Sequence, residues 1–202
     1  MVRAFSDAEK EAIRQKLLSV GQDMFSRFGL RKTSVDELAA RAGISKGSFY
    51  NFYKSKELLL WDVIENLEKE VRNKFYSMLA KENLGRDDLQ KLFISIFRVV
   101  DEYPLIKMLL NGEEYQLLLR NLPPEIIDDH LAEDHDFANS FVNGLTRTGI
   151  KLPGSIEASG AMLRALFFVA MHKREIGEGY DEGVELLCRI IADSFISEGE
   201  KK

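Results

Sequence analysis

The 202-residue sequence predicts an all-α protein with a small N-terminal helical domain and a larger helical body. Apolar residues recur at three- and four-residue spacing along most of the chain, which is the period of a helix with one buried face. Helix-start signals, glycines and prolines stand between these stretches. Charge also divides the chain, because residues 1–54 carry a net +4 and residues 55–202 a net −9. A basic end on an acidic body favours an anionic partner at the N-terminus.

Composition narrows the class further. Apolar residues make up 45% of the chain, so it is globular, and 4 Pro and 1 Cys indicate neither a proline-rich linker nor a disulfide framework. Cys188 lies in an apolar helical pattern, which favours a buried thiol over a reactive one. Residues 1–10 contain no apolar run, and the run 165–171 is far shorter than the roughly 20 residues of a membrane span. We therefore expect a cytoplasmic protein that does not enter membranes.

Three helices are expected in residues 1–54. Ser6 with Glu9 and Ser34 with Glu37 have the spacing of capping boxes, and Gly29 ends the first helix. Gly43 gives the second helix a left-handed end, and a third helix runs from Ser45 to about Tyr53. The last two form a helix-turn-helix at about residues 33–52. The expected core residues are Phe25, Phe28, Leu38, Ile44 and Phe49.

The third helix carries the candidate binding chemistry. Phe49 points inward, and the opposite side presents Lys46, Gly47, Ser48, Tyr50 and Asn51. In helix-turn-helix proteins the start of this helix contacts base edges in the major groove. A hairpin that only packs is the alternative. The agreement of cap, turn, exposed aromatic residue and basic neighbours favours nucleic-acid binding.

The body is expected to begin at Ser55, which starts a helix over about 56–80. This helix joins the two domains without a flexible linker, so it is expected to act as a rigid coupler. The further expected helices are one opened by Asp87–Gln90, Pro104 to about Gly112, Glu113–Arg120, about Glu125–Thr148, about Ser155–Ile176 and about Asp181–Ser197.

The stretch Gly43–Leu59 resembles the signature of the tetracycline-repressor (TetR) family of transcription regulators. The resemblance covers about the first sixty residues. It implies an all-helical homodimer, with a DNA-binding domain at residues 1–54 and an effector-binding and dimerisation domain at residues 55–202. It also implies a regulator, most often a repressor, that leaves a palindromic operator when a small molecule binds.

The resemblance implies DNA contacts position by position. Lys46, Gly47 and Ser48 match groove-reading positions, while Tyr50 and Lys56 match phosphate contacts. The full expected set of DNA-binding residues is Thr33, Ser34, Lys46, Gly47, Ser48, Tyr50, Asn51, Tyr53 and Lys56. The chain departs from the family pattern at Phe52–Tyr53. Phe52 has no hydroxyl, so Tyr53 either supplies a phosphate contact or packs.

Aromatic and methionine side chains of the body suit a pocket for an apolar or aromatic effector, although each could equally fill the core. The candidate pocket residues are Trp61, Phe75, Phe93, Phe97, Met108, Tyr115, Phe137, Phe141, Phe167 and Met171. Candidate polar groups for the same effector are Glu113, Glu114, Gln116, Arg164 and His172.

The last two helices carry more apolar residues than one face can hold, with Leu186 and Ile190 lying off the main stripe of the final helix. A partner subunit is the simplest cover for the surplus, and the central helix of a monomer is the alternative. The expected dimer residues are Leu163, Phe167, Val184, Leu187, Ile191 and Phe195.

Other chemistries lack a motif. His130 and His135 do not share a helix face, so no metal site is expected, and no cofactor fingerprint or catalytic set is present. We therefore expect a DNA-binding regulator rather than an enzyme. The competing classes are a helical-bundle interaction protein whose helix-turn-helix reads no specific site, and a small helical enzyme.

Overall fold

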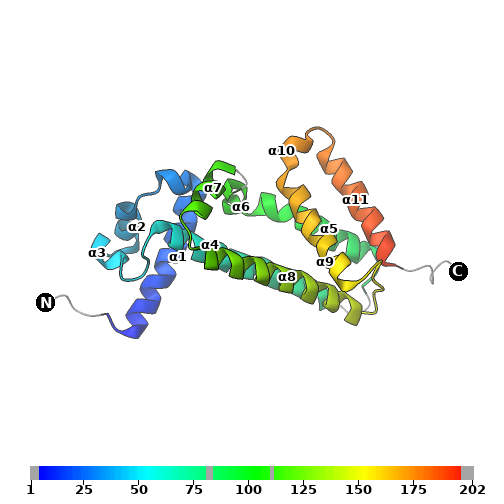
Figure 1. The fold of residues 1–202 in the computed structure, drawn as a ribbon, viewed down its shortest axis with the longest axis horizontal. Coiled ribbons are helices and arrows are strands. Elements are labelled where there is room, and N and C mark those ends of the chain that lie inside the picture. The colour runs from blue at the N-terminus through cyan, green and yellow to red at the C-terminus, as the bar shows by residue number, and fades with distance from the viewer. Residues whose placement is uncertain (1–4, 81–83, 110–111, 197–202) are drawn as a thin grey trace. The chain divides into compact units, whose positions relative to one another are not determined.

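A computed structural model of the chain describes residues 5–80, 84–109 and 112–196 (Figure 1). Every regular element in these three ranges is an α-helix, as the sequence predicts. No helix in this part of the chain is long and apolar enough to cross a membrane. The helices form two compact units. Unit 1 contains Met1–Lys69 and Pro104–Pro124, and unit 2 contains Glu70–Tyr103 and Glu125–Lys202. The boundary after residue 54 stays a prediction.

Unit 1 is built around the N-terminal three helices. It contains α1 (Asp7–Lys32), α2 (Val35–Ala42), α3 (Lys46–Phe49), the first part of α4 (Lys56–Leu79), α6 (Pro104–Leu109) and α7 (Gly112–Arg120). Burial of apolar side chains from these helices holds the unit together. The residues of its core with no exposed surface are Leu17, Phe25, Leu30, Leu38, Phe49, Leu59, Leu60 and Leu118.

The expected helix starts are present with one difference. Ser6 and Glu9 form a complete capping box. The Ser34 hydroxyl accepts the Glu37 N–H at 3.2 Å, but it also donates to the Glu37 carboxylate at 3.0 Å. That carboxylate therefore serves the hydroxyl rather than the Ser34 N–H, and only half of the second box forms. Gly43 adopts the expected left-handed conformation, with φ 78°.

Two expectations for this unit are wrong. Phe28 is 46% exposed, because the chain leaves the helix at Gly29 (φ 74°) and Leu30 fills the core instead. The third helix was expected to reach Tyr53 but ends at Phe49. The backbone continues as a turn, in which the Asn51 and Phe52 N–H groups bond to carbonyls three residues back. Only Phe49 of this short helix is fully buried.

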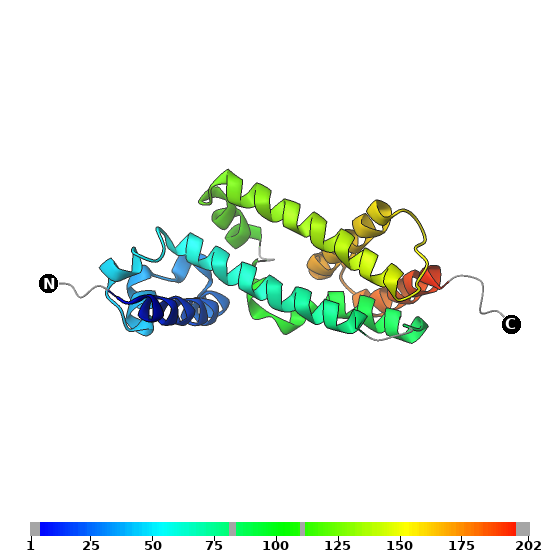
Figure 2. The same cartoon turned by 90° about the horizontal axis from the view of Figure 1, so that it is seen from below.

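Unit 2 contains the rest of α4 with α5 (Arg86–Glu102), α8 (Pro124–Arg147), α9 (Ile156–Met171), α10 (Lys173–Ile176) and α11 (Tyr180–Phe195). The end of α4 and α8 run side by side (Figure 2), and Phe75 meets Phe141 there with ring centroids 6.1 Å apart. On α5 and α11, Phe93 meets Phe195 at 5.4 Å.

Helix boundaries in unit 2 also differ from expectation. α5 begins at Arg86, because the Asp88 carboxylate accepts the Gly85 N–H at 3.1 Å and so opens the helix earlier than the predicted Asp87–Gln90 start. The single helix expected over residues 155–176 divides at His172. Its φ of −104° and ψ of 28° end α9, and α10 follows.

Candidate nucleic-acid interface

The second helix of the helix-turn-helix presents a polar surface over a buried anchor. Phe49 has no exposed surface, whereas Lys46, Gly47 and Asn51 are exposed and Tyr50 is 48% exposed. The Tyr50 ring packs edge-on against Phe49, with centroids 5.6 Å apart. The anchor therefore fixes the helix, and polar atoms remain available on its outer side.

Lys46 is paired within the domain. Its ammonium donates to the Asp36 carboxylate of α2 at 2.8 Å, and both side chains are more than half exposed. This hydrogen bond and the Asp36 charge raise the pKa of Lys46. A DNA phosphate that contacted Lys46 would have to compete with Asp36.

Ser48 and Ser45 complete the start of α3. The Ser45 hydroxyl accepts the Ser48 N–H at 3.0 Å, and the two hydroxyls lie 2.9 Å apart. A Cβ added at Gly47 would have only the Ser45 hydroxyl within 4 Å, at 3.8 Å. The first turn therefore has room on its outer side for another molecule to approach closely.

Three residues of the expected DNA-binding set have a role within the fold. Thr33 is 1% exposed and its hydroxyl donates to the Gly29 carbonyl at 2.7 Å. The Ser34 hydroxyl caps α2. Tyr53 is 5% exposed and donates to the Asp62 carboxylate at 2.9 Å, and burial with this bond raises the pKa of its phenol. Between the two roles left open for Tyr53, this geometry favours packing, and we leave Thr33 and Tyr53 out of the proposed contacts.

Lys56 lies at the start of α4 and reaches back to residues 30–34. This stretch follows the kink of α1 at Gly29 and is here termed the loop before α2. Its ammonium donates to the Leu30 carbonyl at 2.6 Å and to the Thr33 carbonyl at 2.8 Å. An ammonium has three N–H bonds, so one direction is left for a phosphate. Lys56 therefore holds the loop whether or not it also contacts DNA.

Glu114 of α7 holds the same loop from another side. Its carboxylate accepts the Leu30 N–H at 2.7 Å and the Arg31 N–H at 3.3 Å. A Cβ at Gly29 would lie 3.1 Å from this carboxylate, so the glycine leaves room for it. The sequence suggests Glu114 only as a polar group for the effector. Its role here had no sequence signal, because the partners are backbone amides 83 and 84 residues away.

The expected effector residues are distributed over both units. Trp61, Met108 and Tyr115 belong to unit 1, and the other members belong to unit 2. In unit 2, Phe75, Phe137 and Phe141 form one aromatic cluster, which the exposed Tyr76 joins at 5.5 Å from Phe137. Phe93 is fully buried, Phe97 is 5% exposed and Phe167 is half-buried. The side chain of Met171 lies outside the described residues.

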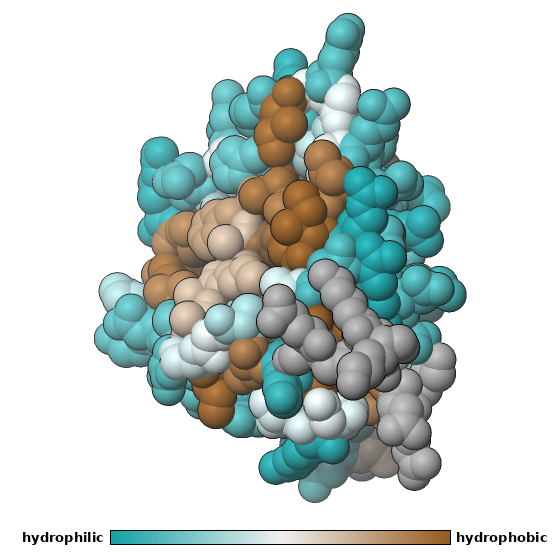
Figure 3. All heavy atoms as spheres, turned by 90° about the vertical axis from the view of Figure 1, so that its right-hand side faces the viewer, coloured by the Kyte–Doolittle hydropathy of each residue, from teal (hydrophilic) through white to brown (hydrophobic). Residues whose placement is uncertain are grey.

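The expected dimer residues face largely inward. Leu163, Val184, Ile191 and Phe195 are between 1% and 8% exposed, and Phe167 and Leu187 are half-buried. The exposed apolar side chains of α9 and α11 are Phe168 at 63%, Leu186 at 48% and Ile190 at 57%. Figure 3 shows apolar side chains gathered on one face of the molecule. The last helices thus do expose apolar side chains, but these belong to other residues than the expected dimer residues.

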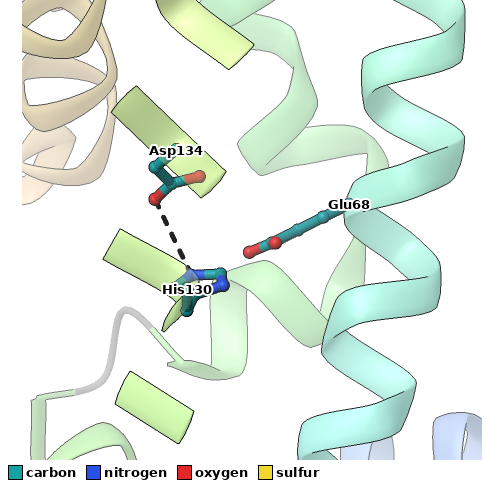
Figure 4. Close-up of side chains that lie close together, drawn as sticks. All are labelled: Glu68, His130 and Asp134. Atoms are coloured by element: carbon teal, nitrogen blue, oxygen red, sulfur yellow. Dashed lines mark ion pairs between the residues drawn. The ribbon is translucent and has the colours of Figure 1, made fainter. Parts of the chain in front are cut away.

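His130 and Asp134 lie one helical turn apart on α8 and point towards each other (Figure 4), with the imidazole and carboxylate 3.7 Å apart. The spacing of His130 and His135 does not reveal this pair, because the partner of His130 is Asp134, four residues on. Asp134 also accepts a hydrogen bond from Arg72 at 2.9 Å. This guanidinium already balances the carboxylate, so the pair fits an ion-pair network better than a cation site.

A helix-turn-helix with a buried anchor and a polar outer face, followed by a helical body, is the arrangement of a DNA-binding regulator. The family described as bacterial regulatory proteins, tetR family, matches residues 17–63. The solved structure of a TetR-family transcriptional regulator from Pectobacterium atrosepticum superposes with a TM-score of 0.72 at 20% identity, over 96% of this chain and 99% of that one. Residues 17–63 therefore match the DNA-binding domain of the TetR family, and the fold of the chain is that of TetR-family regulators.

Known relatives are similar in sequence to this chain over part of their length. An uncharacterized HTH-type transcriptional regulator, YdgC of Bacillus subtilis, is 29% identical over 111 residues, which are 52% of this chain and 57% of the relative. The HTH-type transcriptional repressor KstR2 of Rhodococcus jostii is 28% identical over 92 residues, 46% of this chain and 45% of the relative. The chain thus spans about half the length of these relatives.

Proposed function

We propose that the protein is a homodimeric transcriptional repressor that binds a palindromic operator and is released from it by a small-molecule effector. The observation that carries the proposal is the polar outer face of α3 above the buried Phe49. The proposed contacts are Lys46, Gly47, Ser48, Tyr50 and Asn51, with Lys56 and Ser34 towards the phosphate backbone.

Each proposed contact has a chemical role. The ammonium groups of Lys46 and Lys56 suit phosphates, which position a protein without reading sequence. The exposed amide of Asn51 can pair with an adenine edge in the major groove, and the Tyr50 hydroxyl can donate to a phosphate. Specificity is therefore expected to depend on Asn51 and the first turn of α3.

A dimer would make the operator a palindrome. Two recognition helices must lie about 34–36 Å apart to enter successive major grooves on one face of DNA. The exposed Phe168, Leu186 and Ile190 support the dimer, because burial against a second copy would remove these large apolar side chains from water. A regulator of this kind in a bacterium would act in the cytoplasm.

The test is fluorescence anisotropy with the DNA upstream of the protein's own gene and with a shuffled duplex of the same composition. We expect Asn51→Ala to lose discrimination between the two duplexes by about 1–3 kcal/mol, the usual scale of a bidentate base contact. Tyr76→Ala, an exposed aromatic change in unit 2, is the control and should bind as the parent does. Equal affinity of the parent for both duplexes would support the interaction-protein alternative.

A further inference from the structure

Three buried polar side-chain atoms in unit 2 have no hydrogen-bond partner among the described residues. They are Oδ1 of Asn139 on α8, and Oγ of Ser159 and Nη1 of Arg164 on α9. Ser159 is 2% exposed. Buried polar atoms in native proteins are nearly always hydrogen-bonded, so a group of three unpaired ones on two adjacent elements calls for a reason.

Two of these atoms, Asn139 Oδ1 and Arg164 Nη1, lie close to one glycine. A Cβ added at Gly160 would lie 2.7 Å from Asn139 Oδ1 and 3.6 Å from Arg164 Nη1. Asn139 and Arg164 therefore approach the same point on α9, and Ser159 is the neighbouring residue of that helix. The missing side chain at Gly160 is what allows Asn139 to lie against the α9 backbone.

The surroundings make an unpaired cation costly. Apolar residues flank the group, with Ala138 4%, Leu163 7% and Leu166 3% exposed. A guanidinium nitrogen loses its hydration there and receives no acceptor in exchange. An anionic oxygen is the group that would restore the balance, because it accepts a charge-assisted hydrogen bond from Arg164.

We propose that Asn139 and Arg164 bind the carboxylate headgroup of an amphipathic small molecule. This inference rests on the effector-binding part of the proposed function and assigns that effector a chemical class. One carboxylate oxygen accepts from Arg164 Nη1 and the other from the Asn139 amide. The Asn139 amide turns about its last bond so that Nδ2, rather than Oδ1, faces the ligand. The apolar neighbours on α8 and α9 then receive the hydrocarbon part.

The experiment compares ligands that differ only in the headgroup. Binding of decanoate and of decanol to the full-length protein is measured by calorimetry, without DNA, and acetate, hexanoate and octanoate extend the series by thermal shift. We expect at least one carboxylate to bind with one site per chain and about tenfold or more tighter than its alcohol, as a charge-assisted hydrogen bond provides.

Variants separate recognition from structure. Arg164→Met should remove the preference for the carboxylate while leaving the alcohol's affinity unchanged, and it should raise the melting temperature of the unliganded protein, because it removes a buried nitrogen that has no acceptor. Gly160→Ala should also weaken binding of the carboxylate, since the added Cβ would collide with Asn139. Arg174→Gln, an exposed charge change on α10, is the control and should alter neither.

The outcomes are distinct for the two proposals. If no carboxylate in the series binds in an Arg164-dependent way, or if acid and alcohol bind equally, the headgroup site is wrong. If decanoate binds through Arg164 but leaves operator affinity unchanged, the headgroup site stands and the release mechanism fails. If an uncharged effector releases the operator and no carboxylate binds, the proposed function stands and this inference fails.

Discussion

The carboxylate of Glu114, at the start of α7, accepts the backbone N–H of Leu30 at 2.7 Å, and these residues are 84 positions apart in the chain. The same loop, just before α2, is held through its carbonyls by Lys56. An anion on the amides and a cation on the carbonyls together fix the path from α1 to the helix-turn-helix. Two residues from later helices of unit 1 thus hold the segment that leads into the helix-turn-helix.

Removing the Glu114 carboxylate should loosen this loop. We expect Glu114→Ala to lower the free energy of unfolding by about 1–3 kcal/mol, because two backbone N–H groups lose a charged acceptor. It should also weaken operator binding, since α2 follows the loop directly. Urea denaturation and anisotropy measure the two effects.

Two matched variants control this prediction. Glu114→Gln keeps an acceptor oxygen and should recover part of the loss. Glu113→Ala changes the neighbouring carboxylate, which is exposed and lies 3.9 Å from Arg31, and should cost less than about 0.5 kcal/mol. Similar losses for both alanine variants would show that general charge, rather than the hydrogen bonds of Glu114, holds the loop.

Asp36 is expected to restrain Lys46 from DNA. Asp36→Asn removes a negative charge that would lie near the DNA phosphates, and it frees the Lys46 ammonium. We therefore expect tighter binding to the operator and to the shuffled DNA alike, by about threefold to tenfold. Asp7→Asn, which removes an exposed carboxylate at the start of α1, is the control and should change affinity less. Unchanged affinity for Asp36→Asn would show that Lys46 does not approach the phosphates.

Local signals explain why much of the N-terminal unit could be predicted. Ser6, Gly43 and Ser45 act on atoms within a few residues, so their spacing in the sequence determines the helix ends. Phe28 shows the limit of such local signals. It continues the apolar stripe of α1, but the backbone leaves the helical path at Gly29, the next residue, and Phe28 stays exposed. The roles of Glu114 and Tyr53 depend on partners in other elements, which spacing cannot reveal.

The helices of the body could be predicted from the sequence, but which of their apolar faces are buried within the chain could not. A stripe such as Val184, Cys188 and Ile191 indicates a buried face, yet it does not say whether the cover is the same chain or a partner. The structure buries this stripe within the chain and leaves Leu186 and Ile190 exposed. The break at His172 had no glycine or proline to mark it.

The exposed apolar side chains of α11 should decide the oligomeric state. Ile190→Glu would place a charge in the proposed dimer contact, and we expect a folded monomer by light scattering, with an unchanged far-ultraviolet spectrum. Arg189→Glu, the exposed neighbour, should remain dimeric. Phe195→Glu is uninformative here because Phe195 is 1% exposed and its change should unfold the chain. A monomeric parent protein would contradict both the dimer and the palindromic operator.

Cys188 should make stability fall at high pH. Burial, with a smaller effect of the Glu185 charge, raises the pKa of its thiol to about 11 from an ordinary 9.0. The folded state therefore keeps a proton that the unfolded state releases. This contribution is fully present below about pH 9 and is lost as pH rises towards 11. Urea midpoints at pH 8 and pH 10.5 should differ more for the parent than for Cys188→Ala; equal differences would show that other groups cause the loss.

The effector and the operator should bind with negative coupling through α4. This helix is continuous from Lys56 to Leu79 and contributes residues to both units. A small displacement at one end of a continuous helix reaches the other, and α4 begins at Lys56, which holds the loop before α2. Coupling between two ligands is usually about 1–3 kcal/mol and is reciprocal. Bound operator must therefore lower the affinity for the effector by the same factor by which bound effector lowers the affinity for the operator.

Softening α4 should therefore reduce the coupling more than either affinity. Lys69 is exposed in the middle of the helix, and glycine there costs about 1 kcal/mol relative to alanine, so Lys69→Gly is compared with Lys69→Ala. The effector is titrated by calorimetry with and without a saturating operator duplex. We expect the ratio of the two dissociation constants to approach one in Lys69→Gly and to stay at the parent value in Lys69→Ala. Identical effector affinities with and without operator in the parent would rule out transmission through α4, because reciprocity leaves no coupling to transmit.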